Sequence, residues 1–146
     1  MTPKPPIRVL IADDHRLFAE TLGLALDAHP LLQVVGYARE GREAVKLALA
    51  LDPDVVLMDL HMPLVDGLEA TRVISASLPA RVAVLTASPL PEDSLRAREA
   101  GAAAYLTKGA SAEEVVDTVL ELASPSDSYS PAFPPRFLQF RARLAH

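Results

Sequence analysis

Short apolar runs alternate along the chain with longer segments in which apolar residues recur every three or four positions. Short apolar runs are typical of buried β-strands, and the longer spacing is typical of amphipathic helices. Strands are predicted at 7–12, 32–38, 55–58, 81–86 and 103–107, and helices at 15–28, 40–51, 66–77, 91–100 and 111–122. The pattern therefore predicts five consecutive strand–helix units.

The predicted strands are almost continuously apolar and do not alternate with polar residues. Such strands are buried on both faces, as in a parallel sheet that helices cover on both sides. Helix starts are indicated by Asp66 as N-cap, Pro91 in a first turn, and the capping-box pair Ser111 and Glu114. We expect an α/β fold with a doubly wound, five-stranded parallel sheet, in which functional residues gather at the carboxyl ends of the strands.

Proline sets the two ends of the chain apart from its centre. Seven of the 13 prolines lie within residues 1–6 and 124–146. We expect an N-terminal extension at 1–6, one domain at 7–123, and a Pro/Ser-rich linker with a basic, aromatic tail at 124–146.

The segment 124–146 is open to two interpretations. Phe137, Phe140 and Leu144 would share one helical face, with arginines nearby, which suits a docking helix. A helix this short is marginally stable without packing, so an unstructured linker is the alternative. No helix-turn-helix fits into these 23 residues with four prolines, so no DNA-binding domain is expected in this chain.

Composition excludes several classes of function. The chain has no cysteine, which excludes disulfides, thiol catalysis and cysteine metal sites. It has no signal-peptide pattern and no apolar run near the roughly 18 residues of a membrane span, so a cytoplasmic protein without membrane contact is expected. The net charge is −5, and residues 1–130 hold 11 basic and 19 acidic groups. This excess of acid disfavours direct binding of nucleic acid.

Groups that can bind cations or phosphate stand at the ends of four of the five predicted strands. They are Asp13 and Asp14 after the first strand, Asp59 after the third, Thr86 and Ala87 at the end of the fourth, and Lys108 after the fifth. The carboxyl ends of parallel strands meet at one edge of a sheet, so these residues are expected to converge. Clustered acids repel one another and need a cation, and oxygen ligands without thiols favour Mg²⁺ or Mn²⁺.

This set of groups suits phosphoryl transfer, which depends on positioning and charge neutralisation. Asp59 would be the nucleophile and become an aspartyl phosphate. Lys108 would donate to one phosphoryl oxygen, while the Thr86 hydroxyl and the backbone N–H of Ala87 would hold another. Each residue alone has an ordinary interpretation as a helix cap, a strand residue or a surface charge, so the prediction depends on their joint occurrence.

Four motifs occur in the order and spacing of a known family. They are Asp13-Asp14; residues 56–63 (VLMDLHMP) followed by Asp66-Gly67; Leu85-Thr86-Ala87; and Ala100-Gly101-Ala102 with Tyr105 and Lys108. Over residues 7–123 the chain resembles the receiver domain of two-component response regulators. The segments DHR at 14–16, VGYA at 35–38, GREA at 41–44 and KGA at 108–110 resemble the NarL/FixJ (LuxR-type) subgroup. The resemblance implies the flavodoxin-like receiver fold with strand order 2-1-3-4-5.

The resemblance also implies roles at the site. Asp59 would accept a phosphoryl group from a sensor histidine kinase. Asp14, Asp59 and the backbone carbonyl of His61 would bind Mg²⁺ directly, Asp13 would bind it through a water, and Lys108 would contact the phosphoryl group. Such a protein is a signalling module that catalyses its own phosphotransfer and slow dephosphorylation, and it is not a metabolic enzyme.

On phosphorylation, the resemblance implies that Thr86 moves to the phosphoryl group and that Tyr105 turns inward. This switch would alter the face formed by residues 91–122, and with it homodimerisation or partner docking. Regulation of transcription would then require a helix-turn-helix outside this chain.

Many receivers have a cis proline after the lysine. Gly109 stands here instead, and both isomers remain open for the Lys108–Gly109 bond.

Three other functions use related residues. A pseudo-receiver would serve as a dimerisation or adaptor module without phosphorylation. A haloacid-dehalogenase-type hydrolase would need an acid two residues after the nucleophile, where His61 stands, and a flavodoxin-like carrier would need a phosphate loop where Asp13 and Asp14 lie. His15 and His61 raise the alternative of a transition-metal site, but no third imidazole follows another strand end, which favours a surface or supporting role.

Overall fold

The computed structural model describes residues 5–87, 90–124 and 138–139. Within them a six-stranded sheet has the order β2-β1-β3-β4-β5-β6, and all neighbouring strands are parallel. The strands are β1 (Ile7–Ala12), β2 (Leu32–Ala38), β3 (Val55–Asp59), β4 (Arg81–Thr86), β5 (Ala104–Thr107) and β6 (Leu138–Gln139). The predicted order 2-1-3-4-5 is confirmed, with β6 added beyond β5.

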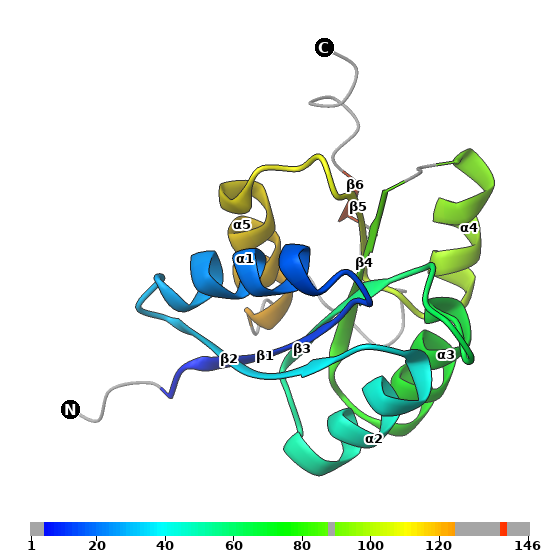
Figure 1. Ribbon diagram of the computed structural model, residues 1–146, viewed down its shortest axis with the longest axis horizontal. Coiled ribbons are helices and arrows are strands. Elements are labelled where there is room, and N and C mark those ends of the chain that lie inside the picture. Colours follow the sequence, from blue (N-terminus) through cyan, green and yellow to red (C-terminus); the bar gives the residue numbers. More distant parts are fainter. Residues whose placement is uncertain (1–4, 88–89, 125–137, 140–146) are drawn as a thin grey trace.

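Helices cover both faces of the sheet, as the apolar strands predicted (Figure 1). They are α1 (Arg16–Asp27), α2 (Gly41–Leu51), α3 (Gly67–Ser77), α4 (Pro91–Glu99) and α5 (Ala112–Ala123). One core lies beneath α1 and α5, and a second core lies beneath α2, α3 and α4. Successive side chains of a strand point to opposite faces, so Val9 and Ile11 enter the first core while Leu10 enters the second.

The helix starts agree with the sequence to within one residue because their caps form as expected. The Asp66 side chain accepts a hydrogen bond from the Glu69 N–H, and Ser111 and Glu114 complete a capping box. Pro91 is the first residue of α4. Helix α1 differs: its N-cap is His15, whose side chain makes no cap hydrogen bond. Neither Asp13 nor Asp14 therefore occupies the N-cap position of α1.

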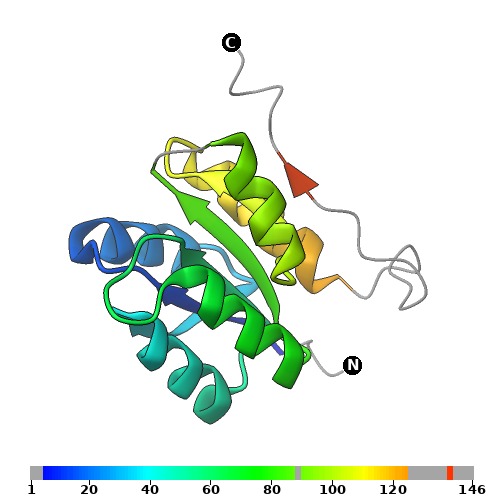
Figure 2. The same cartoon turned by 90° about the vertical axis from the view of Figure 1, so that its right-hand side faces the viewer.

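The end of the chain adds an unexpected strand. Leu138 and Gln139 pair with Ala104 and Tyr105, so that β6 extends the sheet past β5 (Figures 1 and 2). The expected docking helix through Phe137, Phe140 and Leu144 concerns residues outside the described part of the chain, as do residues 1–4 of the N-terminal extension. Among the helices of the described segments, none has both the length and the apolar character that a membrane span needs.

Candidate functional site

The carboxyl ends of β1, β3 and β5 bring together three charged side chains that are 46 to 95 positions apart in the sequence. The Lys108 Nζ lies 2.8 Å from Asp13 Oδ2 and 3.4 Å from Asp59 Oδ2. Both carboxylates have side chains only 2% exposed, and the lysine side chain is 11% exposed. One ammonium thus holds two buried carboxylates, which confirms that these three residues converge.

The pair of carboxylates is only partly neutralised. Burial raises the pKa of the Asp59 carboxyl above its ordinary value, and the negative charge of Asp13 raises it further. The Lys108 ammonium and the hydrogen bond from the His61 N–H, 3.2 Å from Asp59 Oδ1, act in the opposite direction. The remaining negative charge is what a bound divalent cation would neutralise.

This pKa shift predicts a pH-dependent stability. Because its pKa is raised in the folded state, Asp59 binds a proton more readily there than in the unfolded chain. Ionised Asp59 therefore destabilises the fold, and this penalty appears as pH rises from the ordinary pKa of 3.8 through the raised pKa. With cations chelated, the unfolding free energy of Asp59→Asn is expected to increase relative to that of the unsubstituted protein as pH rises across this window. Denaturant titrations at a series of pH values would contradict this if the difference stayed constant.

The end of β4 completes the same edge of the sheet. Strand pairing places Leu85 opposite Asp59, and Thr86, fully buried, follows one residue further along. The Thr86 carbonyl accepts the backbone N–H of Lys108 at 2.8 Å, which joins the ends of β4 and β5. Ala87 comes next and is exposed. The predicted phosphate-binding hydroxyl and backbone N–H thus lie on strand ends adjacent to Asp59.

Tyr105 lies on β5, away from the carboxylates. Its side chain is 4% exposed and belongs to the core that also contains Ala97 of α4 and Ala102. Burial raises the pKa of the phenol, and the negative charge of Asp93 raises it further. The ring therefore already has, without a phosphoryl group, the inward position beneath α4 that the resemblance implies for the phosphorylated state. Its role as a switch stays a prediction.

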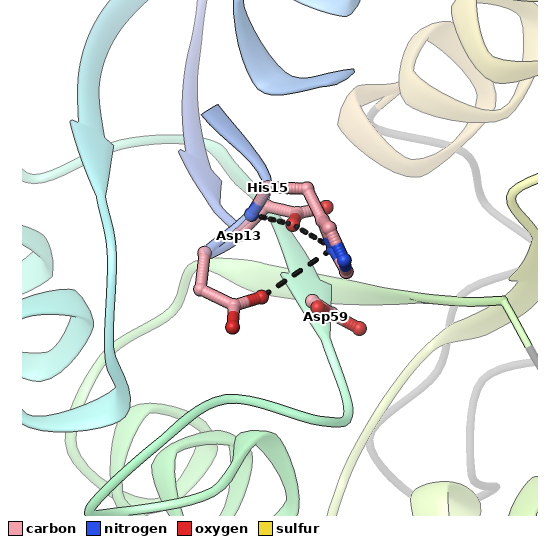
Figure 3. A group of neighbouring side chains, drawn as sticks. Asp13, His15 and Asp59 are labelled. Atoms are coloured by element: carbon pink, nitrogen blue, oxygen red, sulfur yellow. Dashed lines mark hydrogen bonds and ion pairs between the residues drawn. The ribbon is translucent and has the colours of Figure 1, made fainter. Parts of the chain in front are cut away.

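His15 is a residue for which the sequence favoured a surface or supporting role, and the structure places it beside the charged cluster. Its Nδ1 lies 3.0 Å from Lys108 Nζ, 3.3 Å from Asp13 Oδ1 and 3.4 Å from Asp14 Oδ1. Figure 3 shows the His15 ring beside the carboxyl groups of Asp13 and Asp59. In the sequence, His15 stands directly after the two acids, and with His61 it raised the alternative of a transition-metal site.

Phe18 is a residue that sequence reasoning missed. The Lys108 Nζ lies 4.8 Å from the centre of its ring, within the range of a cation–π contact. Phe18 is on the first turn of α1, so this contact fixes the lysine from the helix side while the carboxylates hold it from the sheet side. The helical spacing of Phe18 indicated only a core position.

The Lys108–Gly109 bond is trans, since the described residues contain no cis peptide bond.

The loop after Asp59 depends on a glycine. The Gly67 N–H bonds to the Leu60 carbonyl at 3.1 Å, and a Cβ at this position would lie 2.0 Å from the Asp59 carbonyl oxygen. Gly67→Ala is therefore expected to push α3 away from β3 and to lower the unfolding free energy by about 2 kcal/mol in denaturant titrations. Gly109→Ala is the matched control, because its Cβ would meet only the Thr107 hydroxyl at an ordinary 3.5 Å. Equal stability of the two variants would contradict the prediction.

The donor set at this edge fits a divalent cation. Asp13, Asp14, His15 and Asp59 each offer one ligand atom, and these atoms lie within 4.8 Å of one another. Carboxylate oxygens are the ligands that Mg²⁺ prefers, usually one or two together with waters. The side chain of Asp14 is 37% exposed, which leaves room for water beside it. The expected carbonyl ligand His61 follows Asp59 by two residues, and its ligand role stays a prediction.

Comparison with known proteins agrees with this geometry. A family model described as the response regulator receiver domain matches residues 9–120. The chain is 43% identical over 126 residues to the response regulator GacA of Pseudomonas aeruginosa, covering 86% of this chain and 59% of GacA. It is 41% identical over 114 residues to the transcriptional regulatory protein LiaR of Bacillus subtilis, covering 77% of this chain and 54% of LiaR. The chain thus spans little more than half the length of these curated relatives.

Comparison with solved structures indicates the same family. The solved signal receiver domain of the response regulator NarL from Mycobacterium tuberculosis superposes with a TM-score of 0.80 at 36% identity, covering 84% of this chain and all of that domain. This neighbour confirms the predicted resemblance to NarL-type regulators. The sheet order, the acidic strand ends and the matched family model lead to one conclusion: this chain belongs to the response regulator receiver domain family.

Proposed function

We propose that this receiver is a phosphorylation switch in which Asp59 accepts a phosphoryl group from the phosphohistidine of a sensor kinase. The observation that supports it is the arrangement of Asp13, Asp59 and Lys108, two buried carboxylates that share one ammonium at the sheet edge. In the reaction, an Asp59 carboxylate oxygen attacks phosphorus and the P–N bond of the phosphohistidine breaks. The bonding electron pair stays on the imidazole nitrogen, which then takes up a proton.

The residues of the chain have separate tasks in this reaction. Lys108, already within reach of Asp59, donates to an oxygen of the transferred group. Thr86 and the backbone N–H of Ala87 donate to another oxygen from the end of β4. Asp13, Asp14 and Asp59, together with the His61 carbonyl, would hold Mg²⁺, which supplies charge neutralisation for the phosphoryl oxygens.

The acetyl phosphate reaction tests this function without a kinase. The protein is incubated with acetyl phosphate, with Mg²⁺ or with a chelator, and its intact mass is measured. We expect one added phosphoryl group with Mg²⁺ and none with the chelator. No addition under either condition would contradict the proposal and favour the pseudo-receiver, a dimerisation or adaptor module with the same fold.

The output of the switch is proposed to be the face formed by α4, β5 and α5. Tyr105 lies beneath this face and Thr86 at the adjacent strand end, so a shift of Thr86 toward a phosphoryl group would free space near the tyrosine. Such a change would alter homodimerisation or docking of a partner. Because the relatives GacA and LiaR are longer than this chain and LiaR is a transcriptional regulatory protein, we propose that the output is regulation of transcription through a further domain.

A surface beside the site suits the approach of the kinase. A mainly apolar groove of about 190 Å³ runs between α1 and α5 next to Lys108, and Phe18, Leu22 and Val115 line it. On the outer side of α1, away from this groove, Leu17 and Leu24 are 79% and 74% exposed, and Leu24 lines a second hollow toward Tyr37. A kinase helix lying along the groove would bury the side chains that line it and bring its phosphohistidine to the mouth of the pocket.

A further inference from the structure

The outer edge of β5 lies in the middle of the face formed by α4, β5 and α5. Strand β5 pairs with β4 along its inner edge, and its four residues are all buried. Tyr105 packs in the core beneath α4, and Leu106 packs in the core beneath α5. A strand edge presents backbone N–H and C=O groups, and such groups need hydrogen-bond partners where they are buried. The outer edge of β5 is therefore a surface suited to binding an extended strand.

A segment of the same chain occupies this edge. Leu138 and Gln139 pair in parallel with Ala104 and Tyr105, so that β6 lies along the outer side of β5 (Figure 2). Pairing of an extended segment with a sheet edge is a common mode of peptide recognition, in which backbone hydrogen bonds supply affinity. A strand of two residues is shorter than most strands of a sheet. A partner that makes a longer contact with the same face would therefore displace it.

Charge favours the same segment as the occupant. Helix α5 contains four acidic residues and no basic one, and the exposed residues Glu113, Asp117 and Glu121 follow one another at intervals of four along one side of the helix. Like charges at this spacing repel one another. The basic segment, residues 131–146, contains three arginines and no acid. Its charge is opposite to that of α5, so the electrostatic attraction adds to the backbone pairing of β6.

We propose that the outer edge of β5 is a strand-binding site for the chain's own basic segment, and that a second copy of the receiver must displace β6 to reach the face formed by α4, β5 and α5. The inference rests on the proposed function, because it takes this face as the output of the switch. A segment in the same chain is present at a high effective concentration. The segment is therefore expected to weaken homodimerisation of the phosphorylated chain.

Amide hydrogen exchange of the intact, unphosphorylated chain, followed residue by residue by NMR, tests the pairing. The double variant Leu138→Pro/Gln139→Pro removes both backbone N–H groups of β6. The β5 amides that point away from β4 are expected to exchange at least about threefold faster in this β6 variant. The amides of Ala103 and Lys108 donate to carbonyl oxygens of β4 and are expected to keep their exchange rates.

Ser126→Pro/Ser128→Pro is the matched control, because it adds the same two prolines outside β6. It is expected to leave the exchange of the β5 amides unchanged. Unchanged exchange in the β6 variant, or equal acceleration in the two variants, would overturn the inference. A dimer of the unphosphorylated chain that the β6 variant fails to form would also overturn it, because the strand would then pair between two copies.

Analytical ultracentrifugation with acetyl phosphate and Mg²⁺ tests the consequence for the output face. The phosphorylated β6 variant is expected to dimerise at least about threefold more tightly than the phosphorylated unsubstituted chain. Equal dimer affinity, or no dimer from either phosphorylated protein, would overturn the blocking role of the segment. Absence of phosphorylation in both proteins would instead contradict the proposed function, while hydrogen exchange would still test the pairing of β6.

Discussion

Asp59→Asn is expected to abolish phosphorylation by acetyl phosphate, with a loss of at least about 100-fold in the rate of phosphoryl addition. The amide keeps the shape of the side chain but removes the anionic oxygen that attacks phosphorus. Asp59 is the last residue of β3, and its Oδ2 lies 3.4 Å from the Lys108 Nζ that would contact the transferred group. Intact-mass measurements with Mg²⁺ present would follow the reaction over time.

An exposed carboxylate far from the site provides the control for Asp59→Asn. Asp117→Asn changes an exposed carboxylate on α5 and is expected to leave phosphorylation unchanged. The nearest rival nucleophile is Asp13, whose Oδ2 lies 2.8 Å from the Lys108 Nζ. Phosphorylation of Asp59→Asn at the original rate, with peptide mapping to Asp13, would show that the wrong carboxylate had been assigned.

Lys108→Met is expected to produce the largest loss of stability among the site variants. Methionine keeps an apolar side chain beside Phe18 but removes the charge that Asp13 and Asp59 share. Leaving two buried carboxylates without their cation costs about 2–3 kcal/mol of unfolding free energy, somewhat less than for a fully enclosed pair because the pocket opens to water. Denaturant titration near neutral pH with a chelator would measure this loss.

Mg²⁺ distinguishes an effect of charge from an effect of packing. If the loss in Lys108→Met comes from the two carboxylates, added Mg²⁺ is expected to recover most of it, because the ion replaces the missing positive charge. Lys46→Met, at an exposed position of α2, is the control and is expected to stay within about 0.5 kcal/mol of the unsubstituted protein. Equal stability of the two variants in chelator would contradict the assigned role of Lys108.

Most of the fold could be predicted because its determinants are local. The apolar run at Ile7–Ala12 is long enough for a strand and too uniformly apolar for a strand with a solvated face, so burial between two helical layers followed. Caps such as Asp66 mark helix starts by a hydrogen bond to a residue three positions away. Asp13, Asp59 and Lys108 were predictable as a group because parallel strands end at the same edge whatever their spacing in the chain.

By itself, then, the sequence determined the five strand–helix units and the strand-end residues Asp13, Asp59 and Lys108. Only the tertiary structure decided that the His15 Nδ1 lies beside Lys108 and that Phe18 lies against the same lysine, since both contacts depend on how α1 crosses the sheet toward a residue about 90 positions away. The close approach of Gly67 to the Asp59 carbonyl and the pairing of β6 with β5 depend on the path of the chain in the same way. Periodicity and capping report which residues are neighbours within an element, whereas these contacts follow from the packing of whole elements against one another.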